Sequence, residues 1–134
     1  MPPPIVELRD LLRALHPVQQ DSTFAFVSVP FTSVIDDLTV IASLREPEGL
    51  SLVLPEAEAL ARGWPILFRA AWITLTVASD LQAVGLTAAV SKALAEAGVA
   101  SNVIAGAHHD HLFVPVERAA AAMQALLAMQ SEAR

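Results

Sequence analysis

Residues 69–98 have the sequence RAAWITLTVASDLQAVGLTAAVSKALAEAG, and a change of periodicity within this stretch decides the fold. Apolar residues alternate with threonines over residues 73–77, which predicts a half-buried strand that starts near Arg69. Over residues 82–97 the apolar residues recur at helical spacing until Gly98, which predicts a helix. The C-terminal half of the chain is therefore expected to open with a strand followed directly by a helix.

Further strands and a helix are predicted downstream of that helix. Residues 102–107 and 111–114 are expected to form two short strands joined at the tripeptide 108–110, and residues 116–130 a final helix. The order strand, helix, strand, strand, helix is five-sixths of a ferredoxin-like βαββαβ unit, which places the fold in the α+β class. The last strand is missing because the remaining segment, 131–134, is polar. A strand from the other half or from a neighbouring chain is expected to complete the sheet.

The N-terminal half is predicted to contain similar elements. They are a helix over residues 5–15, strands over 23–29, 38–44 and 50–54, and a helix over 56–62. Pro47 and Gly49 supply the turn chemistry of a hairpin between the last two strands. Gly63 can end the second helix in a left-handed cap. We therefore expect two units, 1–63 and 64–134, which complement each other and do not fold separately.

Composition narrows the possible functions. The chain has 134 residues, of which 54% are hydrophobic and 16% charged, so it can form a core and is expected to bury a subunit interface. Its net charge of −6 would repel nucleic acid. Its apolar runs fall short of the roughly 18 to 20 residues of a membrane span, so no membrane partner is expected. With no cysteine and no secretory signal pattern, a cytoplasmic location is expected.

Several segments carry a resemblance to a known family. ITLTV at 73–77, LQAVGLTAAV at 81–90, LAEAG at 94–98 and NVI at 102–104 resemble an ACT domain, in particular the C-terminal ACT units of aspartate kinases. NVIAGAHHDHLFV at 102–114 and REPEG at 45–49 resemble small bacterial tandem-ACT proteins related to the ACT_7 and CASTOR-type sensors. The resemblance implies two antiparallel sheets with helices packed on one face, an amino acid or similar small ligand, and a homo-oligomer such as a dimer formed by sheet pairing. It implies neither catalysis nor a cofactor.

The loop at residues 79–87 is the candidate ligand site. Free N–H groups at a helix start can hold a ligand carboxylate, and Gly85 would let the ligand approach the backbone. Asp80 would pair with the ligand ammonium group. The candidate ligand-binding residues are Asp80, Val84, Gly85, Leu86, Thr87, Asn102 and Ile104. The N-terminal half has no counterpart of this loop, so at most one such site per chain is expected.

Two structural alternatives weigh against a ligand role for this loop. Ser79 or Asp80 would simply cap the helix, with Ser79 and Gln82 spaced as a capping box, and Gly85 would only permit close packing. At the level of the whole chain, the competing hypothesis is a structural or protein-interaction module that assembles into oligomers without a ligand.

The cluster His108-His109-Asp110-His111 offers a further alternative. Histidine and aspartate can ligate zinc or nickel, but on a strand His109 and His111 share a face while His108 points away. We therefore predict no metal site, and expect a hairpin with polar turn residues or a pH-responsive contact. The sequence has no adjacent nucleophile–base pair and no phosphate-binding loop, so an enzyme is not predicted.

Overall fold

The computed structural model describes residues 3–133 and divides them into two compact units. Unit 1 contains the described residues up to Gln20 together with those from Trp72 onward, and unit 2 contains Asp21–Ala71. These units differ from the contiguous halves 1–63 and 64–134, because the N-terminal segment packs with the C-terminal part of the chain. Strand β5 (Phe68–Leu75) contributes its first residues to unit 2 and its last residues to unit 1.

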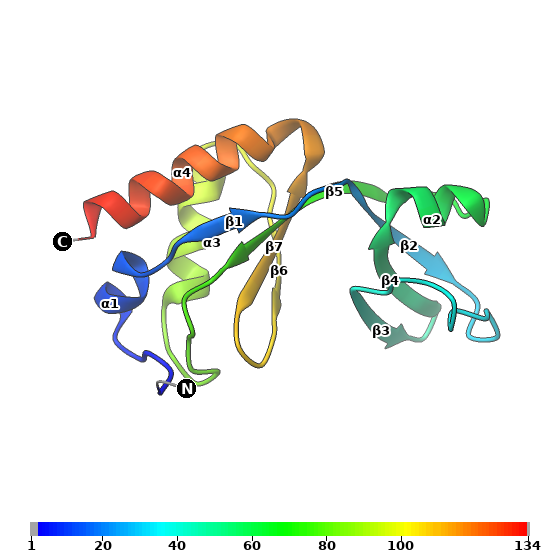
Figure 1. The fold of residues 1–134 in the computed structure, drawn as a ribbon, viewed down its shortest axis with the longest axis horizontal. Coiled ribbons are helices and arrows are strands. Elements are labelled where there is room, and N and C mark those ends of the chain that lie inside the picture. Colours follow the sequence, from blue (N-terminus) through cyan, green and yellow to red (C-terminus); the bar gives the residue numbers. More distant parts are fainter. Residues whose placement is uncertain (1–2, 134) are drawn as a thin grey trace. The chain divides into compact units, whose positions relative to one another are not determined.

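Unit 1 is a four-stranded sheet with helices (Figure 1). Its elements besides β5 are α1 (Leu8–Arg13), β1 (Pro17–Gln19), α3 (Leu86–Glu96), β6 (Asn102–Ala105), β7 (Asp110–Pro115), a 3-10 turn (Val116–Arg118) and α4 (Ala119–Glu132). The strand order is β1-β5-β7-β6, with β1 antiparallel to β5 and β6 antiparallel to β7. Starting from β5 and ending with β1, the elements follow the ferredoxin-like βαββαβ plan.

The strand missing from the C-terminal half is β1 of the same chain. This strand has no signal in the sequence, because its three residues, Pro-Val-Gln, carry no alternating pattern. Val18 pairs with Thr74, and the Gln20 amide donates to the Trp72 carbonyl at 2.8 Å. The helix before it spans Leu8–Arg13, which is shorter than the predicted range 5–15, and His16, the residue before Pro17, has a φ of 42°.

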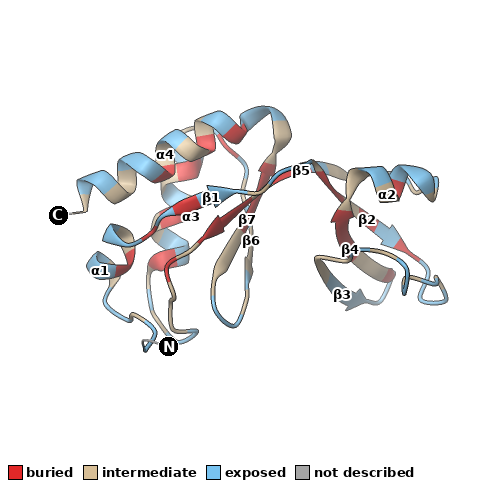
Figure 2. Ribbon diagram, viewed as in Figure 1, coloured by how far each residue is buried: buried red, intermediate tan, exposed pale blue. Residues whose placement is uncertain are grey.

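The core of unit 1 lies between the helices and one face of the sheet (Figure 2). α3 buries Leu86, Val90 and Leu94, and the sheet presents side chains that include the fully buried Ile73 and Leu112. Each such aliphatic side chain contributes about 1.5–3 kcal/mol relative to an exposed one. The predicted strand at 73–77 and the two strands around the histidines are confirmed, with β5 ending at Leu75.

Unit 2 has the same type of sheet with a shorter helical layer. Its elements are β2 (Phe24–Val29), β3 (Ala42–Glu46), β4 (Gly49–Pro55), α2 (Glu56–Ala61) and the first part of β5, in the strand order β3-β4-β2-β5. Val27 lies opposite Leu52, and both are buried in a core that α2 closes with Ala59. The structure confirms the predicted hairpin around Gly49. It also confirms the helix that ends before Gly63, a residue with a φ of 67°.

The predicted strand over residues 38–44 is wrong in its first part. The segment between β2 and β3 forms turns, at the place where the βαββαβ plan has its first helix. Leu38 and Val40 still pack against the unit 2 core, which explains their apolar character. The Thr39 amide donates to Glu58 Oε1 at 2.8 Å, so its hydrogen bond goes to a side chain of α2.

No helix within residues 3–133 combines the length and the apolar character that crossing a membrane requires.

Candidate functional site

Helix α3 begins at Leu86, four residues later than the sequence predicted. Gly85 is its N-cap residue, with φ 109° and ψ −20°, and its carbonyl accepts the Ala89 amide at 2.9 Å. No side chain caps this helix. The first-turn amide groups of α3, which have no acceptor within a helix, therefore also lack a side-chain acceptor.

The capping-box alternative is wrong. Ser79 Oγ donates to Asp110 Oδ2 at 3.2 Å, which connects the loop to strand β7. The Asp80 carboxylate accepts the Gln82 amide at 2.7 Å, and the Asp80 carbonyl accepts the Ala83 amide at 3.0 Å. Both side chains thus stabilise the loop before α3 and do not reach the helix start.

Gly85 packs closely against helix α1. A Cβ atom on Gly85 would lie 3.2 Å from Leu8 Cδ2. Close packing, one of the two roles that the sequence suggested for this glycine, is therefore present, and the atom that approaches it belongs to α1.

Backbone hydrogen bonds fix the start of the loop. The Ile5 amide donates to the Ala78 carbonyl at 2.8 Å, and the Asp80 amide donates to the Ile5 carbonyl at 3.1 Å. The side chains of Leu81 and Val84 are nevertheless 68% and 86% exposed. The loop therefore has an anchored base and an apolar, exposed tip.

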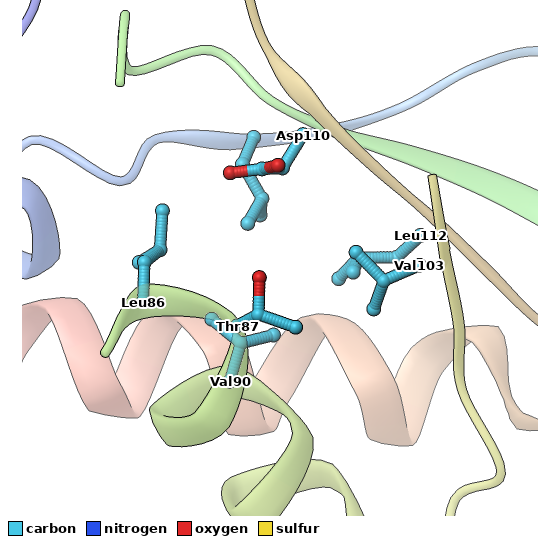
Figure 3. Close-up of a pocket in the computed structure, with 7 residues that line it drawn as sticks. Leu86, Thr87, Val90, Val103, Asp110 and Leu112 are labelled. Atoms are coloured by element: carbon cyan, nitrogen blue, oxygen red, sulfur yellow. The ribbon is translucent and has the colours of Figure 1, made fainter. Parts of the chain in front are cut away.

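Beside the start of α3 lies a narrow hollow between the helix and the sheet (Figure 3). Its lining consists of Leu75, Leu86, Thr87, Val90, Val103, Asp110 and Leu112. The space between these side chains is nowhere wide enough for a water molecule. The Thr87 hydroxyl points from α3 toward the side of the hollow on which Asp110 lies (Figure 3). Five aliphatic side chains thus surround a space with one hydroxyl and one carboxylate.

The structure brings only part of the predicted site to this hollow. Leu86 and Thr87 line it, whereas Asp80, Val84 and Gly85 belong to the adjoining loop. Strand β6 pairs Val103 with Leu112 and Ile104 with His111. Because side chains alternate along a strand, Val103 faces α3, and the predicted residues Asn102 and Ile104 lie on the opposite face.

Sequence reasoning missed Val103 and Asp110 as lining residues. The second strand of the hairpin gives no signal that would have found them, because Leu-Phe-Val at 112–114 is apolar throughout. Leu112, Phe113 and Val114 are all buried, so it is the position of Leu112 in the hollow, and its pairing with Val103, that identifies the face turned to α3. Because side chains alternate along β6, the choice of Asn102 and Ile104 as lining residues left out Val103 between them.

The histidine hairpin carries a different set of contacts. His111 Nδ1 accepts a hydrogen bond from Trp72 Nε1 at 3.0 Å and lies 3.2 Å from Thr74 Oγ1. Burial lowers the pKa of His111 below its ordinary value, nearby His109 lowers it further, and Asp110 acts in the opposite direction. Among residues 3–133, no group of three or more His, Cys, Asp or Glu side chains is arranged to hold a metal ion.

Matches to known protein families cover both units of the chain. Residues 3–71 match one ACT-domain family and residues 68–128 match a second. No curated protein matches the chain. A crystal structure of a protein of unknown function from Vibrio cholerae, described as a "possible transport protein", is 43% identical with a TM-score of 0.81, and the match covers 92% of this chain and 95% of that one.

More distant structures share the fold. The ligand-free regulatory subunit of aspartate kinase from Thermus thermophilus is 11% identical with a TM-score of 0.68, and the match covers 87% of this chain and 97% of that chain. The corresponding subunit from Thermus flavus is 12% identical with a TM-score of 0.57, and covers 84% and 95%. ACT domains are regulatory modules and carry no catalytic centre of their own. Taken with the two matched segments and the 43% identity, these findings show that the chain belongs to the ACT-domain family, as a tandem of two ACT domains.

Proposed function

We propose that this regulatory module binds an amino acid with a small aliphatic side chain at the start of α3, and that it catalyses no reaction. The observation that carries the proposal is the first turn of α3, which has no side-chain cap and begins beside a hollow lined by Thr87 and Asp110.

Each part of an amino acid has a matching group there. The free first-turn amides of α3 and the positive end of its dipole favour a carboxylate. Asp110 has no cationic partner among the described residues and accepts only the Ser79 hydroxyl, so it can pair with an ammonium group. The aliphatic walls of the hollow favour a branched apolar side chain.

The hollow is closed in this structure, so binding requires the first turn of α3 to move away from the sheet. Such a movement would begin at Gly85, whose positive φ marks the change from loop to helix. In this proposal Asp80 and Val84 form the outer wall of the site, and Leu86 and Thr87 contact the ligand. Val103 takes the place that the sequence assigned to Asn102 and Ile104.

A second candidate is assembly without a ligand. It is favoured by the exposed Leu81 and Val84, and by β6, an edge strand of unit 1 whose outer backbone groups can pair with another strand. We propose that the chain forms a homodimer through such sheet pairing in either case. Only the ligand-binding candidate predicts that an amino acid raises the thermal stability of the chain.

A thermal-unfolding screen of the full chain against the twenty amino acids separates the two candidates. Ligand at a hundred times its dissociation constant adds about 2.7 kcal/mol, which corresponds to a rise of several degrees in the midpoint. We expect a branched aliphatic amino acid to give this rise in the wild type and in the control Asp21→Asn, an exposed position in unit 2. Asp110→Asn should abolish it.

The screen has a clear negative outcome. If no amino acid shifts the midpoint at millimolar concentration while light scattering still shows a stable oligomer, the ligand proposal fails and the assembly candidate stands. If an amino acid shifts wild type and Asp110→Asn equally, a ligand binds but the site is elsewhere.

A further inference from the structure

A chain of hydrogen bonds on one face of the unit 1 sheet joins β5, β7 and Gln20, the residue that follows β1. Gln20 Nε2 donates to Thr74 Oγ1 at 3.0 Å, Thr74 Oγ1 lies 3.2 Å from His111 Nδ1, and Trp72 Nε1 donates to the same nitrogen at 3.0 Å. Trp72 and Thr74 alternate along β5 with the buried Ile73, so they lie on the face turned away from it. Phe113 stacks on the Trp72 ring at 6.0 Å and helps to hold the indole in place.

The donors around His111 fix its tautomer. An indole N–H can only donate, so His111 Nδ1 must carry a lone pair and the proton must sit on Nε2. The Thr74 hydroxyl accepts from Gln20, which leaves its own proton free to donate to His111 Nδ1. A protonated imidazole has N–H groups at both nitrogens and no acceptor. Protonation would therefore place the Trp72 N–H against another N–H donor, whereas the Thr74 hydroxyl, which also has acceptor lone pairs, could accept from the new Nδ1–H.

The network sits where the chain leaves unit 1 and where it returns. Unit 1 ends at Gln20 on the way out and resumes at Trp72 on the way back. The backbones of these two residues are hydrogen bonded at 2.8 Å, and both side chains belong to the network. One nitrogen of His111 thus contributes to holding both connecting residues within unit 1.

The surroundings of His111 set the direction of its response to pH. His109 and Asp110 are the charged or titratable groups on its own hairpin that act on it. From β5 it faces Trp72 and Thr74, and its partner on β6 is Ile104, none of which titrates near neutrality. Burial and His109 lower the pKa below 6.5, so the neutral form is the one present at pH 7.

We propose that His111 is a pH-sensitive acceptor that holds the Trp72 indole when neutral and releases it when protonated. Acidification then loosens Trp72, one of the two connecting residues of unit 1, without any change in the core beneath α3. The proposal is independent of a ligand, because His111 does not line the hollow.

Nuclear magnetic resonance of the full chain tests it directly. Long-range ¹H–¹⁵N correlations should show the Nε2–H tautomer of His111 at pH 7.5, and Trp64→Phe assigns the remaining indole signal to Trp72. As the pH is lowered from 7.5 to 5, the imidazole and indole signals should change with the same midpoint. At pH 5, indole proton exchange should be about 5- to 10-fold faster than in a variant that keeps the acceptor, as expected for loss of one hydrogen bond.

His111→Asn provides that variant, because the Asn side-chain oxygen can occupy the position of Nδ1 and accept without titrating near neutrality. It should retain the Trp72 indole signal and lose its pH dependence. The control His108→Asn changes an exposed histidine of the same hairpin. In this control the Trp72 indole signal should keep the pH dependence of the wild type.

Two results would overturn the proposal. One is the Nδ1–H tautomer at pH 7.5, and the other is an indole response that is the same in wild type and His111→Asn. The first needs only the wild-type protein, so the test remains decisive even if His111→Asn does not fold.

Discussion

Gly85 and Leu8 meet so closely that a Cβ atom on the glycine would lie 3.2 Å from the Leu8 Cδ2 atom. The contact joins the start of α3 to α1, an element from the other end of the sequence. The helix begins at Leu86 because Gly85, with a φ of 109°, cannot continue it toward the N-terminus. The proposed ligand site therefore depends on packing with a helix outside the matching C-terminal segment.

Gly85→Ala should lower the free energy of unfolding by about 1–2 kcal/mol, because an alanine is strained at this φ and its methyl group would press on Leu8. Urea unfolding measures the loss. Gly63→Ala is the matched control, because Gly63 also has a positive φ, 67°, but no atom lies within 4 Å of a Cβ there. The control therefore measures the cost of backbone strain without a steric contact. Equal losses in the two variants would show that the Leu8 contact adds nothing, whereas Leu8→Ala should relieve part of the Gly85→Ala loss.

Arg62 should hold the turn segment between β2 and β3. Its guanidinium donates to the Val34 carbonyl at 2.8 Å, pairs with Asp37 at 2.6 Å and lies 5.2 Å from the centre of the Trp64 ring. Arg62→Ala should accelerate amide hydrogen exchange at residues 34–39 and cost about 1 kcal/mol, since Asp37 is exposed and screened by solvent. Arg62→Lys keeps the charge without the planar donor group and should restore only part of the protection. Unchanged exchange in Arg62→Ala would show that the segment is held by its apolar contacts alone.

The parts of the fold that the sequence predicted correctly are those with a local pattern. The alternation from Ile73 to Leu75, the hairpin at 45–49 and the glycine-ended helices all depend on contacts between near neighbours in the sequence. β1 was missed because three residues carry no periodicity, and its pairing with β5 joins Val18 to Thr74. Leu38 and Val40 were assigned to a strand because burial, which the sequence shows, does not require a strand.

The candidate site was harder to predict for a different physical reason. A pocket wall depends on which face of a strand is buried, and β6 has too few residues to show it. Asn102 and Ile104 were chosen over Val103, and only the pairing with His111 and Leu112 reveals the correct face. Asp110 was treated as a turn residue of the histidine hairpin, although it is the first residue of β7 and lines the hollow.

Stability should fall with acid in a manner that depends on His111. The folded state lowers the pKa of His111, so below pH 6.5 the unfolded chain binds more protons than the folded one at this residue. The stabilisation is fully present above pH 6.5 and is lost as the pH falls through the lower pKa of the folded state. One group can change the free energy of unfolding by at most about 1.4 kcal/mol per pH unit.

Urea unfolding at pH 7.5 and pH 5 checks this prediction, with the wild type compared with His111→Asn. The other titrating groups are common to both proteins, so the wild type should lose more stability than the variant. A variant that loses as much as the wild type would assign the acid sensitivity to other residues.

Leu11→Ala should be among the most damaging truncations in the chain, although it lies in a short helix of six residues near the N-terminus. Leu11 is 0% exposed, and removing a fully buried leucine side chain leaves a cavity that typically costs about 2–5 kcal/mol. Val6→Ala is the matched control, since Val6 is 58% exposed and its truncation should change stability by no more than about 0.5 kcal/mol. Unfolding followed by fluorescence in a Trp64→Phe background, where Trp72 is the remaining tryptophan, reports on unit 1, to which both residues belong. A loss no larger for Leu11→Ala than for Val6→Ala would mean that the N-terminal helix is not part of the unit 1 core. The completion of that sheet by β1 would then need another source of stability.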